Sequence, residues 1–329
     1  MFTDYDRRRE TELQKSEETD EGDRSTTFPP IEIFRQPKYG SHLRSGRWKI
    51  HENYGKGERK VTGTFGSEPG ALDAPTVEPL LVAEKLTKRY GSVTALSNMG
   101  LTIGKGEHVA IVGDNGAGKS TLVKILSGAI HPDSGQLRFA DHDIDFKSPV
   151  QAKSLGIETV FQTLALVDDL DIAANLFLGR EMVRWRWGAM SIMDRQGMKK
   201  RAREIIQETG VNIQDITVTV AGLSGGQRQG VAISRAVGWG SQLVILDEPT
   251  AALGVRETEQ VEGIVRGLKA RGIAVLLVSH NLQQVFRLVD RIVVMRRGQL
   301  AGVRDAKETT PDDLVSLITG AGADRLVEG

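Results

Sequence analysis

One short segment has residue types and spacing suited to holding phosphate groups. The residues from Gly113 to Ser120 read G-x-x-x-x-G-K-S, after the apolar run EHVAIVG and before the helical pattern STLVKILSG. The glycines let backbone N–H groups converge on phosphate oxygens, and the N-terminus of the helix adds partial positive charge. In such a loop Lys119 reaches the β- and γ-phosphates, and the Ser120 hydroxyl binds Mg²⁺. The segment therefore predicts a nucleotide-phosphate site with a bound Mg²⁺.

Two acidic residues end another apolar run, SQLVILDE. Asp247 has the oxygen ligands that Mg²⁺ prefers, and Glu248 is placed to polarise an attacking water as a general base. Alone, two acids at a strand end are typical of a helix cap or a solvated pair. Beside a phosphate loop they predict hydrolysis of the bound nucleotide.

A third motif, Leu223-Ser-Gly-Gly-Gln227, opens the helical pattern RQGVAISRAVG. Ser224 is a good N-cap, and the two glycines expose backbone donors at a helix N-terminus. These features indicate a second phosphate site, distinct from the first. A capped turn without a ligand is the alternative interpretation.

The elements that must position these motifs alternate between apolar strands and amphipathic helices. Strands are expected at 79–90, 94–103, 107–113, 157–161, 241–248, 272–280 and 290–298, and helices at 193–210, 225–238, 255–272 and 280–289. Buried strands that alternate with helices imply an α/β fold with a largely parallel sheet covered on both faces. The stretch from about Gln162 to Trp239 is helix-rich and is expected to contain no strand.

Residues Pro79 to Gly320 resemble the ATP-binding subunits of ABC transporters, whose signature LSGGQ matches. The resemblance implies a P-loop NTPase core with a mixed sheet and flanking helices, an α-helical subdomain at about 162–239 and an antiparallel β region. It also implies an ATPase that works as a head-to-tail dimer. ATP held by one chain would be closed over by the signature of the other.

The same resemblance assigns roles to residues that are weak signals by themselves. Gln162 in ETVFQTLALV matches the glutamine that senses Mg²⁺ and couples to the membrane partner. His280 in LLVSHNL matches the switch histidine that contacts the γ-phosphate. Tyr90 in LTKRYGSVTAL matches the aromatic residue that stacks on adenine. The expected ATP-binding residues are Tyr90, Gly113, Asp114, Asn115, Gly116, Ala117, Gly118, Lys119, Ser120, Thr121, Ser224, Gly225, Gly226 and Gln227. The expected catalytic residues are Glu248, His280, Lys119 and Gln162, and the expected Mg²⁺ ligands are Ser120, Gln162 and Asp247.

Longer strings, such as DNGAGKSTLVKILSGA and MDRQGMKKRAREIIQETGV, are similar to the ATPases of monosaccharide importers. Ribose-type members usually fuse two copies in one chain, whereas this chain has one copy of each motif, as in the fructose-type branch. The implied partners are integral membrane permease subunits, a second copy of the chain and, through the permease, an extracytoplasmic sugar-binding protein. The implied location is the cytoplasmic face of the cell membrane, as a peripheral subunit.

Composition weighs against other function classes. The chain has 43 basic and 43 acidic residues, so it lacks the overall positive charge typical of nucleic-acid binders, and no nucleic-acid partner is expected. It has no cysteine, which excludes thiolate metal sites and cysteine nucleophiles. The alternative is a soluble ABC-type ATPase acting on ribosomes or DNA. The interval between Lys119 and Ser224 is too short for the long coiled-coil arm of the repair members.

Three segments depart from the family pattern or lie outside it. Gly254 stands near the place where many family members have a D-loop aspartate. Residues 1–77 are polar and expected to be a disordered or linker extension, with a docking segment as the alternative, and 321–329 form a C-terminal tail. Trp185 and Trp187 are expected either to pack against the permease or to fill the helical subdomain.

Overall fold

The computed structural model describes residues 78–187 and 190–321 of the chain. The expectations for residues 1–77, and for the tail beyond Ala321, lie outside the described residues. The strands are β1 (Pro79–Tyr90), β2 (Val93–Gly104), β3 (His108–Val112), β4 (Ser134–Phe139), β5 (His142–Ile144), β6 (Ile157–Val160), β7 (Val183–Trp187), β8 (Met190–Met193), β9 (Leu243–Asp247), β10 (Ala274–Val278), β11 (Arg291–Arg296) and β12 (Gln299–Asp305). The helices are α2 (Lys119–Leu126), α3 (Pro149–Ser154), α4 (Ile172–Phe177), α5 (Arg195–Thr209), the 3₁₀ turn η1 (Val220–Gly222), α6 (Gly225–Val237), α7 (Val255–Ala270), α8 (Leu282–Leu288) and α9 (Pro311–Thr319).

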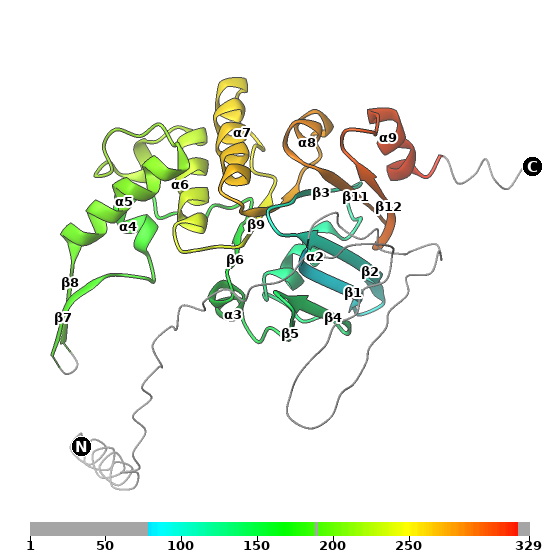
Figure 1. Cartoon of the computed structure of the whole chain (residues 1–329), viewed down its shortest axis with the longest axis horizontal. Coiled ribbons are helices and arrows are strands. Elements are labelled where there is room, and N and C mark those ends of the chain that lie inside the picture. The colour runs from blue at the N-terminus through cyan, green and yellow to red at the C-terminus, as the bar shows by residue number, and fades with distance from the viewer. Residues whose placement is uncertain (1–77, 188–189, 322–329) are drawn as a thin grey trace, which may run out of the picture. The chain divides into compact units, whose positions relative to one another are not determined.

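A six-stranded sheet in the order β12-β11-β3-β10-β9-β6 forms the centre of the core (Figure 1). The five strands from β11 to β6 are parallel, and β12 joins the edge antiparallel to β11. All five residues of β3 and of β10 are buried, as expected for strands covered on both faces. The expected mixed sheet with flanking helices is confirmed.

The two faces of this sheet pack into two separate hydrophobic clusters, because side chains alternate along each strand. On β3, Ala110 and Val112 face the cluster formed with helices α4 to α9, whereas Val109 and Ile111 face the cluster formed with α2, β1 and β2. Figure 1 shows α7, α8 and α9 on one side of β3 and β11, and β1, β2 and β4 on the other.

A second, four-stranded sheet in the order β2-β1-β4-β5 is antiparallel throughout. The expected antiparallel β region is therefore present. It covers one face of the six-stranded sheet and packs against α2, the helix that follows the phosphate loop.

The helical subdomain differs from the sequence expectation in two respects. It contains α5 and α6 as expected, but it also contains α4, where no helix was expected, and β7 and β8 form a two-stranded antiparallel hairpin between α4 and α5. The expectation of no strand between Gln162 and Trp239 was therefore wrong. Val183 and Ile192, which belong to this hairpin, leave apolar surface exposed, so the segment has no buried face from which periodicity could identify a strand.

Aromatic packing holds the helical subdomain together, and an ion pair fastens it to the core. Phe177 at the end of α4 is fully buried and meets Trp239 edge to face, with ring centroids 5.0 Å apart. Such a contact contributes roughly 0.5–1.5 kcal/mol beyond the buried area. Arg180 lies over the Trp239 ring and donates to Glu158 Oε1 of β6 at 2.5 Å. The subdomain is thus joined to the strand that precedes Gln162.

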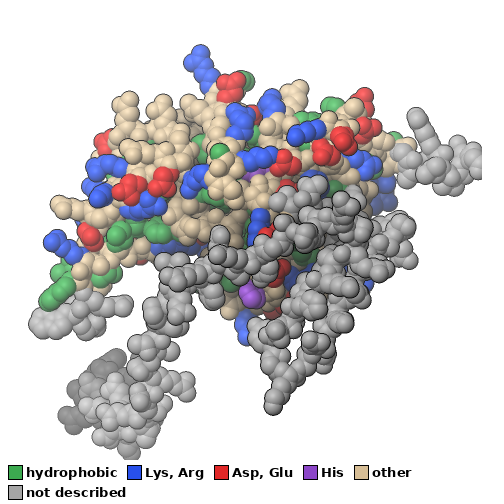
Figure 2. Space-filling view, viewed as in Figure 1, with side chains coloured by type: hydrophobic (Ala, Val, Ile, Leu, Met, Phe, Trp, Pro, Cys, Tyr) green, Lys and Arg blue, Asp and Glu red, His purple; other side chains and the backbone are tan. Residues whose placement is uncertain are grey.

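No helix among the described residues is long and apolar enough to cross a membrane. Basic and acidic side chains are interspersed over the face drawn in Figure 2, and hydrophobic side chains gather at the β7–β8 end. Trp185 is 61% exposed there and Ile192 is 60% exposed. The side chain of Trp187 lies outside the described residues.

Candidate functional site

Four neighbouring parallel strands bring most of the predicted site residues to one edge of the sheet. Val278 of β10 pairs with Ile111 of β3 and with Asp247 of β9, and Val160 of β6 pairs with Leu246 of β9. The loops that follow these strands therefore begin side by side. They hold the phosphate loop, His280, Glu248 and Gln162, which are far apart in the sequence.

The phosphate loop connects β3 to α2, and its glycines adopt conformations that side chains would block. Gly113 has φ 155°, and a Cβ there would overlap the Met295 carbonyl oxygen. Gly118, the N-cap of α2, has φ 98°, and a Cβ there would lie 2.5 Å from the carbonyl oxygen of Ala95. Both glycines are required because β2 and β11 press against the loop from outside.

Lys119 closes over this loop. Its Nζ donates to the carbonyl oxygens of Gly113 at 2.8 Å and Asp114 at 3.0 Å. These bonds hold a positive charge above the backbone amides of the loop, where phosphate oxygens would bind. Asp114, Asn115, Gly116 and Ser120 are exposed, whereas Ala117 is buried and Thr121 half-buried.

Glu248 and His280 meet across the edge. Glu248 Oε2 lies 2.8 Å from His280 Nδ1, and the histidine side chain is 75% exposed. Glu248 has a left-handed backbone with φ 52°, which turns the chain sharply at the end of β9. Non-glycine residues rarely adopt this conformation, and such strain gathers at functional sites. The structure thus brings together two residues separated by the whole of α7 and β10.

Asp247 has the properties of a cation ligand. Burial raises the pKa of Asp247, the neighbouring Glu248 carboxylate raises it further, and Lys119 and Lys124 oppose the shift. Within the described ranges no hydrogen-bond donor contacts the Asp247 carboxylate. A half-buried carboxylate without a donor fits a hard cation, for which hydroxyl and amide oxygens are suitable companions. Ser120 in the first turn of α2 and Gln162 in the loop after β6 have such oxygens at the same edge.

The two remaining predicted residues near this edge lie on the surface. Gln162 lies in the loop after β6, one residue beyond Phe161, and is exposed. Tyr90 ends β1, is 48% exposed, and has Lys88 Nζ 5.9 Å from its ring centre. Tyr90 pairs with Val93 at the start of β2, the strand whose Ala95 touches Gly118. An exposed ring beside the phosphate loop is suited to stacking on a base.

The signature residues form a separate site at the N-terminus of α6. Ser224 and Gln227 make a reciprocal capping box, in which Gln227 Oε1 accepts from Ser224 N at 3.1 Å and Ser224 Oγ accepts from Gln227 N at 3.4 Å. Gln227 Nε2 also donates to the Asn212 carbonyl. Among the described residues, no hydrogen bond joins the signature to the phosphate loop.

Three further residues tie the motifs together, and the sequence analysis did not single them out. Glu257 Oε2 accepts from the N–H of Gly254 at 3.0 Å. That amide holds the pKa of Glu257 below its usual range, with smaller contributions from the amide of Gly226 and the Ser224 hydroxyl. Glu257 bonds the amide three residues before it, as the acid of a capping box does, and an acid at that spacing was a usable signal. At the place of the missing D-loop aspartate, the chain therefore has a capped helix start that faces the signature.

Arg235 and Gln284 are the other two. Arg235 on α6 donates to the carbonyl oxygens of Leu164 and Ala165, both at 2.8 Å, and so joins the signature helix to the loop after Gln162. Gln284 on α8 is fully buried and bonds Thr250 and Ser279. No sequence pattern marks either residue, because their partners lie far away in the chain.

Comparisons with known proteins agree with this geometry. The family model described as ABC transporter matches residues 96–251. The chain is 47% identical over 249 residues to the fructose import ATP-binding protein of Rhizobium meliloti, covering 74% of this chain and 95% of that protein. It is 40% identical to a ribose import ATP-binding protein of Rubrobacter xylanophilus, covering 77% of this chain but 48% of that protein. A dimeric post-hydrolysis structure of an ATP-binding cassette with ADP and phosphate matches with TM-score 0.59 and 26% identity, over 70% of this chain and all of that one.

Proposed function

Because the chain belongs to the ABC transporter family, we propose that it is the ATP-hydrolysing subunit of a monosaccharide importer, acting at the edge formed by β3, β10, β9 and β6. The observation that supports this most directly is the contact between Glu248 and His280 beside a glycine-formed phosphate loop. A proton acceptor and a second polar group then lie beside the loop that would hold the γ-phosphate. The half-buried Asp247 supplies a cation ligand to the same edge.

Hydrolysis follows from these positions. Lys119 exchanges its bonds to Gly113 and Asp114 for β- and γ-phosphate oxygens, and neutralises the charge that develops there. Glu248 accepts a proton from a water whose oxygen attacks the γ-phosphorus, while the bond from that phosphorus to the β-phosphate oxygen breaks. His280, beside Glu248, orients the water and the γ-phosphate. Ser120, Asp247 and Gln162 would hold Mg²⁺, which would neutralise phosphate charge.

The signature works in a second copy of the chain. Ser224, Gly225 and Gly226 offer a hydroxyl and backbone donors at the start of α6, but their hydrogen bonds do not reach the described phosphate loop of their own chain. A head-to-tail pair would set each signature over the ATP of the other copy. Closing the pair would exclude water, and loss of the γ-phosphate would release it. The dimeric cassette similar to this chain supports the pairing of two copies.

The transported solute is a sugar by similarity to relatives named as fructose and ribose import ATP-binding proteins. The match along nearly the full length of the fructose protein favours the single-copy branch. The partners are then permease subunits in the membrane, contacted from its cytoplasmic face. An extracytoplasmic sugar-binding protein acts through those permeases.

Steady-state ATPase assays of the whole chain with Mg²⁺ test the catalytic assignment. Glu248→Gln should nearly abolish turnover, because the amide cannot accept the proton, while ATP binding is retained. Lys119→Ala should lose both turnover and ATP binding. Glu259→Gln and Lys200→Ala, which change exposed residues away from the edge, should match the wild type. Unchanged turnover in Glu248→Gln would remove that residue from the mechanism.

Purification from native membranes in mild detergent tests the importer assignment. A multi-span permease and a sugar-binding protein should accompany the chain, and the ligand of that binding protein would identify the solute. Ribosomal or DNA-repair proteins without a permease would overturn the proposal and favour a soluble ATPase.

A further inference from the structure

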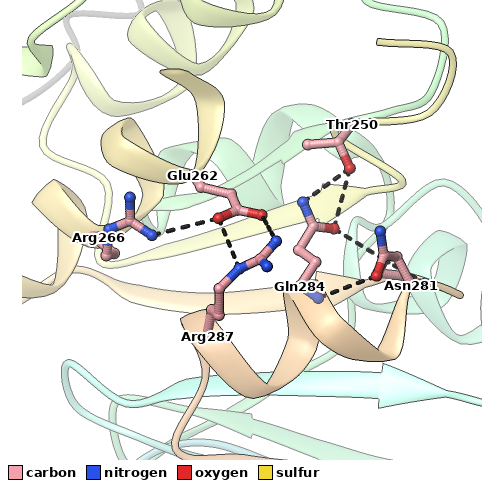
Figure 3. Close-up of polar contacts among 7 residues, drawn as sticks. Thr250, Glu262, Arg266, Asn281, Gln284 and Arg287 are labelled. Atoms are coloured by element: carbon pink, nitrogen blue, oxygen red, sulfur yellow. Dashed lines mark hydrogen bonds and ion pairs between the residues drawn. The ribbon is translucent and has the colours of Figure 1, made fainter. Parts of the chain in front are cut away.

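A buried glutamine on α8 connects two of the loops at the site edge. Gln284 is 0% exposed. Its Oε1 accepts from Ser279 Oγ at 3.0 Å, and its Nε2 donates to Thr250 Oγ1 at 2.9 Å. Figure 3 shows the side chain directed from α8 towards Thr250. Both ends of the amide are thus used on residues outside its own helix.

One end of this amide controls the residues on either side of His280. The backbone N–H of Asn281 donates to Ser279 Oγ at 3.1 Å, so the hydroxyl bonded to Gln284 also fixes the residue after the histidine. The N–H of Gln284 donates to Asn281 Oδ1 at 3.1 Å, which caps α8. The His280 side chain projects from a segment held at both neighbours.

The other end controls the loop of Glu248. Thr250 lies two residues after Glu248, in a tight turn in which the N–H of Ala251 donates to the Glu248 carbonyl at 3.1 Å. The left-handed backbone of Glu248 begins that turn. The position of the Thr250 hydroxyl is therefore coupled to the backbone conformation of Glu248 at the end of β9.

We propose that Gln284 is a positioning residue for ATP hydrolysis, which holds the loop of Glu248 and the loop of His280 at the spacing that lets the two side chains meet. This inference rests on the proposed function. The Gln284 side chain is fully buried and bonds Thr250 and Ser279, so it would act through these two residues. An apolar side chain would pack α8 against the core equally well, whereas a buried amide requires partners. Here the partners are the two loops.

Gln284→Met tests this role, because methionine fills a similar volume without hydrogen bonds. A displacement of about 1 Å at reacting groups can cost on the order of 100-fold in rate. We expect kcat to fall by roughly 10- to 100-fold while KM for ATP stays within about twofold, since the phosphate loop is untouched. Gln283→Met, the exposed neighbour on the same helix, is the matched control and should retain wild-type kcat.

A double-mutant cycle separates positioning from simple packing. Thr250→Val removes the hydroxyl at the other end of the bridge, so the variant carrying both changes should lose no more than Gln284→Met alone. Wild-type kcat in Gln284→Met, or losses that add, would overturn the inference. If Gln284→Met does not fold, the single variants Thr250→Val and Ser279→Ala test the role instead. Each should lower kcat several-fold at unchanged KM. Wild-type kcat in both variants would refute the positioning role of Gln284.

The outcome is independent of the test of the proposed function. Turnover by the wild type and its loss in Glu248→Gln establish the ATPase whatever Gln284→Met does. A wild-type chain without ATPase activity would instead remove the premise of both.

Discussion

At the scale of single residues, Glu248 has a backbone conformation that lowers the stability of the fold. Its left-handed backbone, φ 52°, is of order 1–3 kcal/mol less favourable than an ordinary strand conformation. That conformation aims the carboxylate at His280 instead of along β9. The surrounding bonds, from Glu248 N to the Val278 carbonyl and from Ala251 N to Glu248, hold it in place. A strained residue at this point is consistent with a role in the chemistry.

Substitution of Asp247 is predicted to change stability and activity in opposite directions. Burial raises the pKa of Asp247, so its ionised form is unfavourable in the nucleotide-free fold. Asp247→Asn should raise the melting temperature of the free chain near neutral pH, while Mg²⁺-dependent ATPase falls at least about 100-fold. Calorimetry and ATPase assays at several Mg²⁺ concentrations measure both. A variant that is less stable and retains Mg²⁺-dependent turnover would contradict the assignment.

His108 predicts how stability depends on pH. Burial lowers the pKa of His108 below its ordinary value of 6.5, and its Nδ1 bonds the Leu288 carbonyl at 3.1 Å. Below about pH 6.5 the unfolded chain binds a proton that the folded chain binds only at lower pH. The free energy of unfolding should therefore fall with decreasing pH in that window, by up to about 1.4 kcal/mol per pH unit from this residue.

Urea unfolding between pH 7.5 and about pH 5, the window set by a lowered histidine pKa, checks this prediction. His108→Asn keeps a donor for the Leu288 carbonyl but does not titrate there. Its stability should decline less steeply than that of the wild type as the pH falls. Equal slopes for the two proteins would show that another group is responsible.

At the scale of elements, α7 and α8 are joined by a buried carboxylate. Glu262 on α7 is 3% exposed and accepts two bonds from Arg287 on α8, at 2.6 and 3.1 Å (Figure 3). Arg266, one turn further along α7, contacts the same carboxylate at 3.5 Å. Because α7 follows the loop of Glu248 and α8 follows His280, this pair fixes the helices that carry the two loops.

Arg287→Met should destabilise the chain by about 1–3 kcal/mol, since it leaves a buried carboxylate with a single weak partner. Arg266→Met is the control and should cost less than about 0.5 kcal/mol, because this exposed arginine makes one long contact, at 3.5 Å, within its own helix. Denaturant unfolding of both variants gives the comparison. Similar losses of stability in the two variants would mean that the ion pair between Glu262 and Arg287 does not hold α7 and α8 together.

At the scale of the whole molecule, one copy of each motif predicts an ATP-dependent dimer. Glu248→Gln with ATP and Mg²⁺ should elute from size exclusion at twice the monomer mass of 35.9 kDa, and without ATP at the monomer mass. Adding Ser224→Arg should abolish the dimer, because the long arginine side chain would occupy the space at the start of α6 that the partner's ATP needs. A persistent monomer of Glu248→Gln under these conditions would contradict the head-to-tail arrangement.

The exposed end of the helical subdomain is the other large-scale feature. Val183, Trp185, Ile192 and Met193 of the β7–β8 hairpin expose apolar surface, and Figure 2 shows hydrophobic side chains at that end. Trp185 therefore does not serve only to fill the subdomain. Contact with the permease remains a prediction for this residue.

The sequence alone predicted the chemistry of the site and determined most of the elements. The phosphate loop, the acid pair and LSGGQ each have a fixed local spacing that their function requires, so the residue order by itself identifies them. The strands β3, β9 and β10 are recognisable because burial on both faces demands continuous apolar runs. Hydrophobic periodicity likewise indicates α5, α6 and α7, since each helix buries one face.

Only the tertiary structure decided how the motifs meet. The contact between Glu248 and His280, the bridge made by Gln284, and the Arg235 bonds to the loop after Gln162 depend on the order of the strands in the sheet. That order is set by crossover connections and side-chain packing across long sequence separations, which local patterns do not encode. The β7–β8 hairpin was not predicted from the sequence for a related reason: it has no buried face that would impose an alternating pattern on its residues.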